Sequence, residues 1–285
     1  YMDEMTPVAT QEPAGHTAKR WWLLAVMAGA LFLLAFYSLS DPARLAHDPL
    51  LTAGDYAGYA ICHRITERSF TIAGRQFPLC ARCTGTYLGV MLAFGALLLA
   101  GRGRRAGLPV RRVLVALALL VAIMGLDGLN SYSHFFPGAP HLYEPQNWLR
   151  LLTGLGTGLA MGLVITPALV QTLWREPEWR PAIASLYELG GLLLLAGLLA
   201  LLVLSNQPVL SYVLAIVSAA GVVLMIAVLN TMVLLIATRR DGHAAAWRQA
   251  APYLVAGLLL AVVEIGLVSA IRYALTGTMT GLPGL

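Results

Sequence analysis

LYELGGLLLLAGLLALLVLSNQPVLSYVLAIVSAAGVVLMIAVLNTMVLLIAT, residues 186–238, is apolar almost throughout and contains no lysine or arginine. A helix needs roughly 20 apolar residues to cross a hydrocarbon core, so this stretch is far too long for one span. Asn206, Gln207 and Pro208 interrupt it, and a proline disfavours helical backbone at the residue before it. We therefore predict two membrane-spanning helices, Leu186–Ser205 and Val209–Thr238, joined by a tight turn.

The composition of the whole chain also indicates a membrane location. Hydrophobic residues make up 58% of the 285 residues and charged residues 12%, and the mean hydropathy is +0.73. Soluble domains carry roughly 25% charged residues, so we predict an integral membrane protein without a separate soluble domain. The net charge of +5 indicates membrane topology and not nucleic-acid binding, because no basic stripe with interleaved aromatic residues is present.

Five further apolar runs have the length of a membrane span. They are Trp21–Leu39, Thr84–Ala100, Val113–Asn130, Leu149–Leu173 and Pro252–Leu275. The first is long for the apolar part of a signal peptide and is followed by a poor cleavage site, so we expect a true span. The predicted fold class is all-α, a polytopic transmembrane bundle of about seven helices in which consecutive helices are antiparallel neighbours.

The basic residues predict a cytoplasmic N-terminus, since cytoplasmic loops of membrane proteins are enriched in lysine and arginine. With that orientation, residues 1–20 form a cytoplasmic tail and twelve of the nineteen basic residues lie inside: Lys19, Arg20, Arg102, Arg104, Arg105, Arg111, Arg112, Arg175, Arg180, Arg239, Arg240 and Arg248. The predicted outer loop, residues 40–83, is an exception with five arginines. Membrane topology does not explain them, so we expect them to have a local role.

All three cysteines lie in this loop, as Cys62-His63 and Cys80-Ala81-Arg82-Cys83. Cys-x-x-Cys places two sulfurs where one tetrahedral ion can take both, and Cys62 with His63 completes a Cys3His set that suits zinc. Either His134 or His141 of the next outer loop is an alternative fourth ligand. A Cys80–Cys83 disulfide with Cys62 free also stays open, because the outer side permits disulfides, and so do unmodified thiols.

Charged and polar groups from two other spans are predicted at the same face. Asp127 ends the third span, and Asn147 and Arg150 open the fourth, one helical turn apart. An acid at that depth is costly without a partner. We expect Arg150 to contact either Asp127, as its natural partner, or an anionic head group, with Arg68 or Arg82 nearby. Asp127, Asn147 and Arg150 are all candidates for a catalytic role. The loop arginines Arg64, Arg68, Arg75 and Arg82 suit bidentate binding of phosphate in a head group or partner.

Two features deeper in the spans are expected to be structural. Gly154, Gly158 and Gly162 recur every four residues and predict a close helix–helix contact, with a smooth wall for a lipid tail as the alternative. Glu264 and Asn230 are expected to form hydrogen bonds within the bundle. A proton or ion relay through Glu264 is the alternative.

The motifs resemble those of a prokaryotic membrane protein family, domain of unknown function 2085. The resemblance rests on Cys62-His63, Arg68-Ser69-Phe70, Gly74, the run Cys80–Gly89, Asp127-Gly128, and Asn147 with Arg150 and Gly154. It extends from about Ile61 to Gly162. It implies a membrane core at residues 21–173 and a C-terminal three-helix extension at residues 174–285, and it supports the site without implying a reaction.

Two functions are compatible with these residues. The first is binding or processing of an anionic lipid head group at a Cys/His metal site on the outer face of the cell membrane, with zinc as Lewis acid or water activator. The second is a non-catalytic accessory subunit of a larger membrane complex, in which the Cys/His loop is a structural element. The number of protein ligands on the metal discriminates between them, because structural zinc sites are closed by four.

Overall fold

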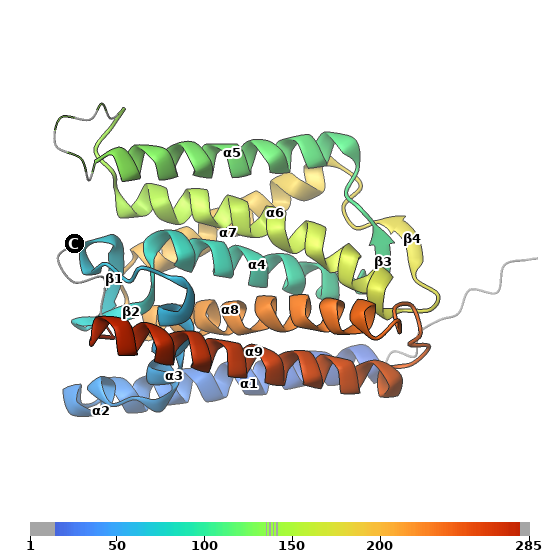
Figure 1. The fold of residues 1–285 in the computed structure, drawn as a ribbon, viewed down its shortest axis with the longest axis horizontal. Helices are drawn as coiled ribbons and strands as arrows, with labels where there is room; N and C mark the ends of the chain where they lie inside the picture. Colours follow the sequence, from blue (N-terminus) through green and yellow to red (C-terminus); the bar gives the residue numbers. More distant parts are fainter. Residues whose placement is uncertain (1–14, 135, 137, 139, 141, 280–285) are drawn as a thin grey trace, which may run out of the picture.

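The computed structural model describes residues 15–134, 136, 138, 140 and 142–279. Long helices lie side by side along the horizontal axis of Figure 1, with short helices and strands at one end and further strands at the other. The end at the left of Figure 1 carries the strands β1 and β2 and is called the outer end below, after the predicted orientation. The end that carries β3 and β4 is called the opposite end.

The helices confirm the predicted all-α membrane fold. After α1 (Gly15–Leu39), six helices are long and apolar enough to cross a membrane: α4 (Ala81–Leu99), α5 (Arg111–Ser133), α6 (Asn147–Leu173), α7 (Leu186–Leu204), α8 (Pro208–Ala237) and α9 (Trp247–Thr276). A seventh span is reached when α1 and the helices after it are taken together, although the chain bends there by 117°. Pro208 opens α8 at the predicted turn, where a proline needs no helical hydrogen bond.

Residues 40–83 are more ordered than the loop that the sequence predicted. They contain α2 (Pro42–Ala46), α3 (Pro49–Ile61), a 3-10 turn at Thr66–Arg68 and the antiparallel strands β1 (Ser69–Ile72) and β2 (Arg75–Cys80). The carboxylates of Asp41 and Asp48 cap α2 and α3, and a proline follows each of them. Asp followed by Pro is a typical helix start, so the sequence did carry this signal.

The opposite end is closed by a small parallel sheet. Its strands are β3 (Arg105–Gly107) and β4 (Glu178–Pro181). Beside it, Arg102 holds the carboxylate of Glu188 with two bonds of 2.7 and 2.8 Å, and the rings of Trp174 and Trp247 meet edge to face at 4.8 Å. These contacts tie the loops after α4, α6 and α8 together.

Helices α4 and α6 pack backbone to backbone through glycines. A Cβ on Gly158 would lie 1.9 Å from the Thr86 carbonyl oxygen, and one on Gly154 would lie 2.2 Å from that of Arg82. Gly85 of α4 approaches the Leu151 carbonyl of α6 equally closely. The predicted close contact is therefore confirmed, and no room is left there for a lipid tail. Since the register rises in the same direction on both helices, α4 and α6 are parallel and begin together at the outer end.

The C-terminal helices belong to the same bundle. Helix α8 packs against α3, α4 and α9, and it lies between α4 and α9 in Figure 1. A buried polar contact fixes it to α3, because the Tyr212 hydroxyl donates a 3.0 Å hydrogen bond to Asp48. Ser38 of α1 also donates to Asp48. The outer end is thus built jointly by the first helices and by α8 and α9, both of which pack against α3.

A thiol cluster and an arginine cluster at the outer end

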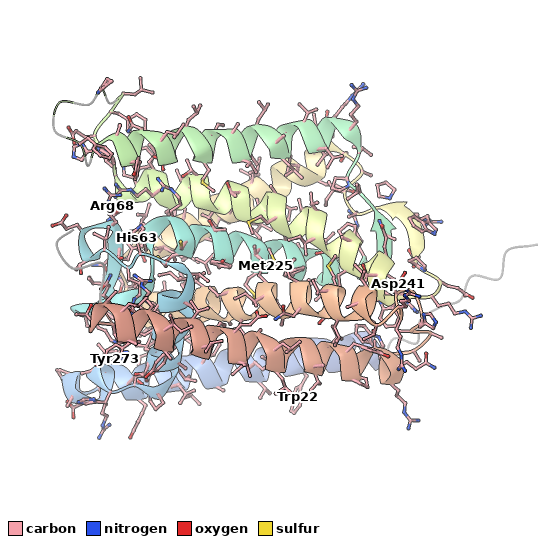
Figure 2. The ribbon with its side chains drawn as sticks, viewed as in Figure 1. Trp22, His63, Arg68, Met225, Asp241 and Tyr273 are labelled. Atoms are coloured by element: carbon pink, nitrogen blue, oxygen red, sulfur yellow. The ribbon has the colours of Figure 1, made fainter. Side chains whose placement is uncertain are left out.

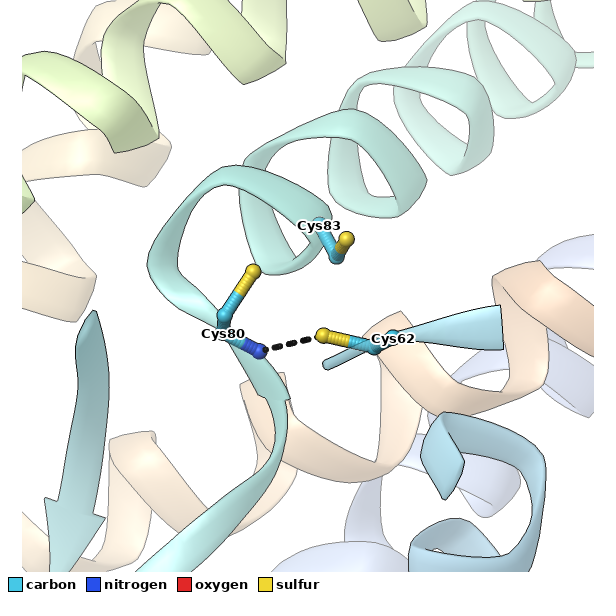
Figure 3. Close-up of side chains that lie close together, drawn as sticks. All are labelled: Cys62, Cys80 and Cys83. Atoms are coloured by element: carbon cyan, nitrogen blue, oxygen red, sulfur yellow. Dashed lines mark hydrogen bonds between the residues drawn. The ribbon is translucent and has the colours of Figure 1, made fainter. Parts of the chain in front are cut away.

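Three different elements bring the cysteines together. Cys62 is the residue that ends α3, Cys80 ends β2 and precedes α4, and Cys83 lies in the first turn of α4. The β1–β2 hairpin delivers Cys80 to this point, since its turn at Ala73 and Gly74 has positive φ at both residues and reverses the chain tightly. Figure 3 shows the three side chains converging; they are called the thiol cluster below.

The sulfur atoms of the thiol cluster all lie within 4.8 Å of one another. Two thiolates on one tetrahedral zinc ion, each at 2.3 Å, stand about 3.8 Å apart, so small side-chain movements would suffice to hold an ion. Cys62 and Cys80 are buried, Cys83 is partly exposed, and all three are free thiols. The arrangement suits a single metal ion with one position left for a fourth ligand.

The surroundings of the Cys62 sulfur stabilise its negatively charged thiolate form. It accepts a 3.3 Å hydrogen bond from the backbone N–H of Cys80 (Figure 3). Hydrogen bonds from the thiols of Cys80 and Cys83 and from backbone N–H groups lower the pKa of Cys62. The hydrogen bond between the Cys62 and Cys80 side chains raises the pKa of Cys80. Arg64 has a φ of 51°, a left-handed conformation that is uncommon for a residue with a side chain. Backbone donors to a ligating sulfur are usual in metal–thiolate sites.

His63 lies beside the thiol cluster but outside the group of three mutually close ligand atoms. Its Nδ1 accepts a 3.1 Å hydrogen bond from the Ile65 N–H, which leaves Nε2 as the ring atom able to bind an ion. Burial lowers the pKa of His63, and repulsion from nearby arginines lowers it further. The neutral ring is the form that ligates metals. Figure 2 places His63 and Arg68 at the same end of the molecule.

The alternative histidine ligands receive no support in the described residues. His134 caps the end of α5, and its Nε2 lies 3.7 Å from a carboxylate oxygen of Glu144. His141 lies outside the described residues. His63 therefore stays the predicted fourth protein ligand.

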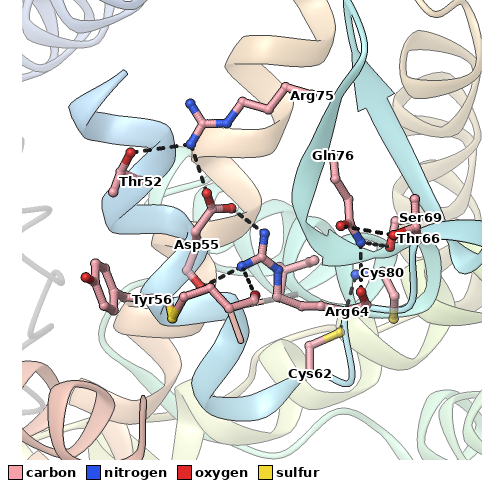
Figure 4. Close-up of polar contacts among 12 residues, drawn as sticks. Thr52, Asp55, Tyr56, Cys62, Arg64, Thr66, Ser69, Arg75, Gln76 and Cys80 are labelled. Carbon is pink, nitrogen blue, oxygen red and sulfur yellow. Dashed lines mark hydrogen bonds and ion pairs between the residues drawn. The ribbon is translucent and has the colours of Figure 1, made fainter. Parts of the chain in front are cut away.

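Two of the four arginines predicted to bind a head group or partner, Arg64 and Arg75, share one carboxylate. Arg64 is buried and binds Asp55 at 2.7 Å, and Arg75 binds the other oxygen of the same carboxylate at 2.8 Å (Figure 4). Arg75 also donates to the Leu45 carbonyl. We predicted both arginines as head-group ligands, and their engagement with Asp55 argues against that role. Asp55 lies in α3, within the stretch that the sequence predicts to be an outer loop, so its role as a partner was not predicted.

Asp127 pairs with Arg82 and not with Arg150, so the predicted Asp127–Arg150 pair is wrong. Arg82 donates to one carboxylate oxygen of Asp127 and, at 3.2 Å, to the hydroxyl of Ser131. The Tyr143 hydroxyl donates to the other oxygen at 2.8 Å. Burial and this contact with Asp127 raise the pKa of Tyr143 to about 12. Helices α4 and α6 begin side by side, so Arg82 in the first turn of α4 takes the place beside Asp127 that was predicted for Arg150 of α6.

Arg150 and Asn147 connect α6 to the hairpin segment. Arg150 donates a 2.9 Å hydrogen bond to the side-chain oxygen of Asn147, whose amide donates at 3.0 Å to the Glu67 carbonyl. Arg68 reaches the Ser131 carbonyl at 3.4 Å. Burial and repulsion by Arg82 lower the pKa of Arg68. Arg68, Arg82 and Arg150 are called the arginine cluster below.

The arginine cluster retains unused hydrogen-bond donors. The Nε atoms of Arg82 and Arg150 are buried and have no hydrogen-bond partner in the described part of the chain. Asp127 is the buried carboxylate bonded to the cluster, and the nearby Glu67 is exposed. The three guanidinium groups therefore leave an excess of positive charge at the start of α4 and α6, where the helix N-termini add to it.

Arg272 of α9 is a further residue that the sequence analysis did not single out. It donates to the backbone carbonyls of Tyr59 and Cys62 and lies over the Tyr59 ring at 4.1 Å. The loop that carries Cys62 is thereby fixed by the last helix of the chain. An arginine near the outer end of a span was the available signal, but its carbonyl partners could not be read from the sequence.

Comparisons with known proteins match the segment of the chain that carries the thiol cluster and the arginine cluster. The sequence model of a family described as predicted membrane protein (DUF2085) matches residues 62–164, which include all three cysteines and the arginine cluster. An uncharacterised protein of Methanothermobacter thermautotrophicus is 34% identical over 108 residues, 36% of this chain and 83% of the relative. One of Methanocaldococcus jannaschii is 24% identical over 163 residues, 55% of this chain and 98% of the relative. No solved structure matches the chain significantly.

Proposed function

Since the chain belongs to the DUF2085 family of predicted membrane proteins, we propose that its family-matched segment holds a zinc ion beside a site for an anionic phosphate group. Both sites lie at the outer face of a prokaryotic cell membrane in this proposal. The observation that carries it is the convergence of three thiols from separate elements within 4.8 Å.

The donor set supports zinc. Three thiolates form a soft, negatively charged site, and Arg64 is close enough to Cys62 for its charge to compensate part of it. Cys62 and Cys80 lie among apolar side chains that include Leu79, Val222 and Ile265. Such a shell limits access of water and favours a firmly held ion. When bound, the ion acts as a Lewis acid if its fourth position is open.

The metal assignment is tested by the zinc content of protein purified from cells without added metal. We expect about one zinc per chain, as for a single thiolate site. The variants Cys62→Ser and Cys83→Ser should lose it, whereas Ser205→Ala, at an exposed turn, should retain it. Protein without zinc in which Cys80 and Cys83 form a disulfide, detected by mass spectrometry, would replace the metal reading.

The arginine cluster supports the anionic site. Arginine binds phosphate oxygens bidentately, and two buried Nε atoms still lack partners in the described residues. His63 follows Cys62 in the chain and lies at the same end of the molecule as Arg68 (Figure 2). A phosphate held by the arginine cluster would therefore lie beside the fourth position of the metal. Asp127 contributes by fixing Arg82 in place.

The anionic site is tested by binding of inorganic phosphate and of short-chain phosphatidic acid to the detergent-solubilised protein. We expect a weakening of about tenfold in Arg68→Gln and Arg150→Gln, equivalent to one lost charge-assisted hydrogen bond. Arg112→Gln at the opposite end should bind as the wild type does. Binding of phosphatidic acid alone indicates a lipid head group, and binding of both indicates a general phosphate site. Unchanged binding in both cluster variants would refute the site.

The accessory-subunit function makes a different prediction for the same centre. Burial of Cys62 and Cys80, and the attachment of their loop to α9 through Arg272, are features that a structural metal site also needs. Substitution of His63 by Ala separates the two. A closed structural site should lose zinc and stability with that change. An open site should retain zinc and lose only ligand binding.

A further inference from the structure

Helices α8 and α9 carry a polar pair at the surface of the bundle. The side-chain amide of Asn230 donates a 3.0 Å hydrogen bond to a carboxylate oxygen of Glu264. The interhelical hydrogen bond expected from the sequence is thus present, but its position differs from the expectation. Glu264 is exposed, and Asn230 is only partly buried, so the pair does not lie within the bundle.

The pair also lies deep along a membrane-crossing helix. At 1.5 Å per residue, Glu264 is roughly 18 Å from the end of α9 at Thr276 and roughly 25 Å from its start at Trp247. The side chains around it are apolar and exposed, with Val263 64%, Leu267 59% and Leu260 43% accessible. In a bilayer these positions contact hydrocarbon, which offers a carboxyl group no hydrogen-bond partner.

We propose that a second copy of this chain covers the α8–α9 face, with Glu264 and Asn230 at the centre of a two-fold symmetric interface. Polar groups exposed in a membrane segment generally mark a contact or a site, because leaving them in lipid is costly. Hydrogen bonds between helices also stabilise association where the hydrophobic effect cannot. The interface is independent of the metal and anion sites at the outer end.

The pair is complementary to itself, which is why a second copy is the favoured occupant. A carboxamide carries two N–H donors, and a carboxyl group has two oxygens that can accept, so the bond within one chain leaves one donor and one acceptor of the pair over. Across a two-fold axis, the second N–H of Asn230 can donate to the free carboxyl oxygen of the partner's Glu264 while the reciprocal bond forms. Each Glu264 then gains the partner that lipid lacks, and the surrounding leucines and valines pack against their own copies.

The test measures the fraction of dimer of the full chain in lipid nanodiscs or detergent as a function of protein-to-lipid ratio. We expect the wild type to dimerise, Glu264→Gln to retain the dimer, and Glu264→Leu to weaken it at least tenfold. The leucine variant also removes the bond between Asn230 and Glu264 within one chain, so its helical content is checked by circular dichroism before the dimer fractions are compared. The matched control is Val263→Leu, which should dimerise as the wild type does.

Three outcomes would overturn the proposal. The wild type could be monomeric at every ratio, the Glu264→Leu protein could dimerise normally, or a different membrane protein could occupy the face stoichiometrically in place of a second copy. Loss of dimer in Glu264→Gln together with Glu264→Leu would also contradict it. The proposed interface requires the hydrogen bonds and not the ionised group.

Discussion

The arginines at the two ends of the bundle have the same charge and opposite surroundings. At the opposite end, Arg104, Arg111, Arg112, Arg175, Arg180, Arg239, Arg240 and Arg248 are exposed. At the outer end, Arg44 on α2 is also exposed, but Arg64 and Arg150 are buried, and Arg68, Arg75, Arg82 and Arg272 are partly buried. The first set is exposed, and its printed contacts are few: Arg104 lies over the Trp174 ring at 4.3 Å, and Arg240 donates to the Tyr253 hydroxyl at 2.9 Å. The second set binds carboxylates and backbone carbonyls, as expected of a constructed site.

The difference between the two ends lies in the partners of the arginines: those at the outer end bind carboxylates on other secondary-structure elements. Asp55 joins Arg64 and Arg75, and Asp127 holds Arg82. The ion pair Arg102–Glu188 is an exception at the opposite end, where it links the loop after α4 to the start of α7. Substitutions at matched positions of the two ends can therefore separate structural from topological arginines.

The largest effect is expected for Arg82→Gln. Asp127 is only 2% exposed, and removal of its partner would leave a buried carboxylate uncompensated, at a cost of about 3 kcal/mol. The free energy of unfolding can be measured by titration with denaturing detergent and read from tryptophan fluorescence. Arg112→Gln at the opposite end should change it by less than about 0.5 kcal/mol. Equal effects would show that the two ends do not differ.

Asp55→Asn should have the second-largest effect. The carboxylate is 18% exposed and binds two arginines, so we expect a loss of about 2 kcal/mol, less than for a fully buried pair. The same titration measures it. Glu176→Gln, at an exposed position of the opposite end, is the matched control and should be close to neutral. A neutral result for Asp55→Asn would mean that Arg64 and Arg75 are held by their carbonyl contacts alone.

Arg272→Gln should act on the metal centre through the loop of Cys62. The guanidinium contacts the Tyr59 and Cys62 carbonyls, and loss of such supporting bonds typically weakens metal binding by about tenfold to a hundredfold. Zinc affinity measured by competition with a chelator gives the result. Arg248→Gln, near the other end of the same helix, is expected to leave the affinity unchanged. An unaltered affinity in Arg272→Gln would separate α9 from the site.

The smallest effect concerns alkaline pH. The pKa of Tyr143 is raised to about 12 by burial and by Asp127, above roughly 10 in the unfolded chain. The folded state therefore retains the proton longer. The contribution of this hydroxyl is fully present below about pH 10 and is lost as the pH rises towards 12. Tyr143→Phe should flatten the fall in stability over this window relative to the wild type, while Tyr187→Phe, 93% exposed, should not.

The sequence predicted the helices well and the contacts between side chains less well. Apolar run length determines where a helix can cross a membrane, and the observed ends of α7 and α8 agree with the prediction within two residues. The glycines at four-residue spacing likewise predicted the contact of α6, because only small residues allow such an approach. The convergence of the three cysteines was predicted because thiolates are soft ligands that a single metal ion can bind together.

Partner choice among the arginines could not be predicted in the same way. The sequence places Arg150 near the end of the span that carries Asp127, but the parallel start of α4 brings Arg82 to that carboxylate instead. Asp55 escaped notice because α3 is short and its apolar residues belong to a predicted loop. The first error comes from tertiary geometry that periodicity does not encode. The Asp-Pro pairs at residues 41–42 and 48–49 were the missed local signal.

The measurement that most directly tests the proposed metal site at the thiol cluster is X-ray absorption at the zinc edge of the purified protein. The account predicts three sulfur atoms at about 2.3 Å and one nitrogen or oxygen atom at about 2.0 Å. Exchange of the light atom on addition of phosphate would indicate an open position next to the arginine cluster. A spectrum without sulfur neighbours, or protein free of zinc with Cys80 and Cys83 oxidised to a disulfide, would contradict the account.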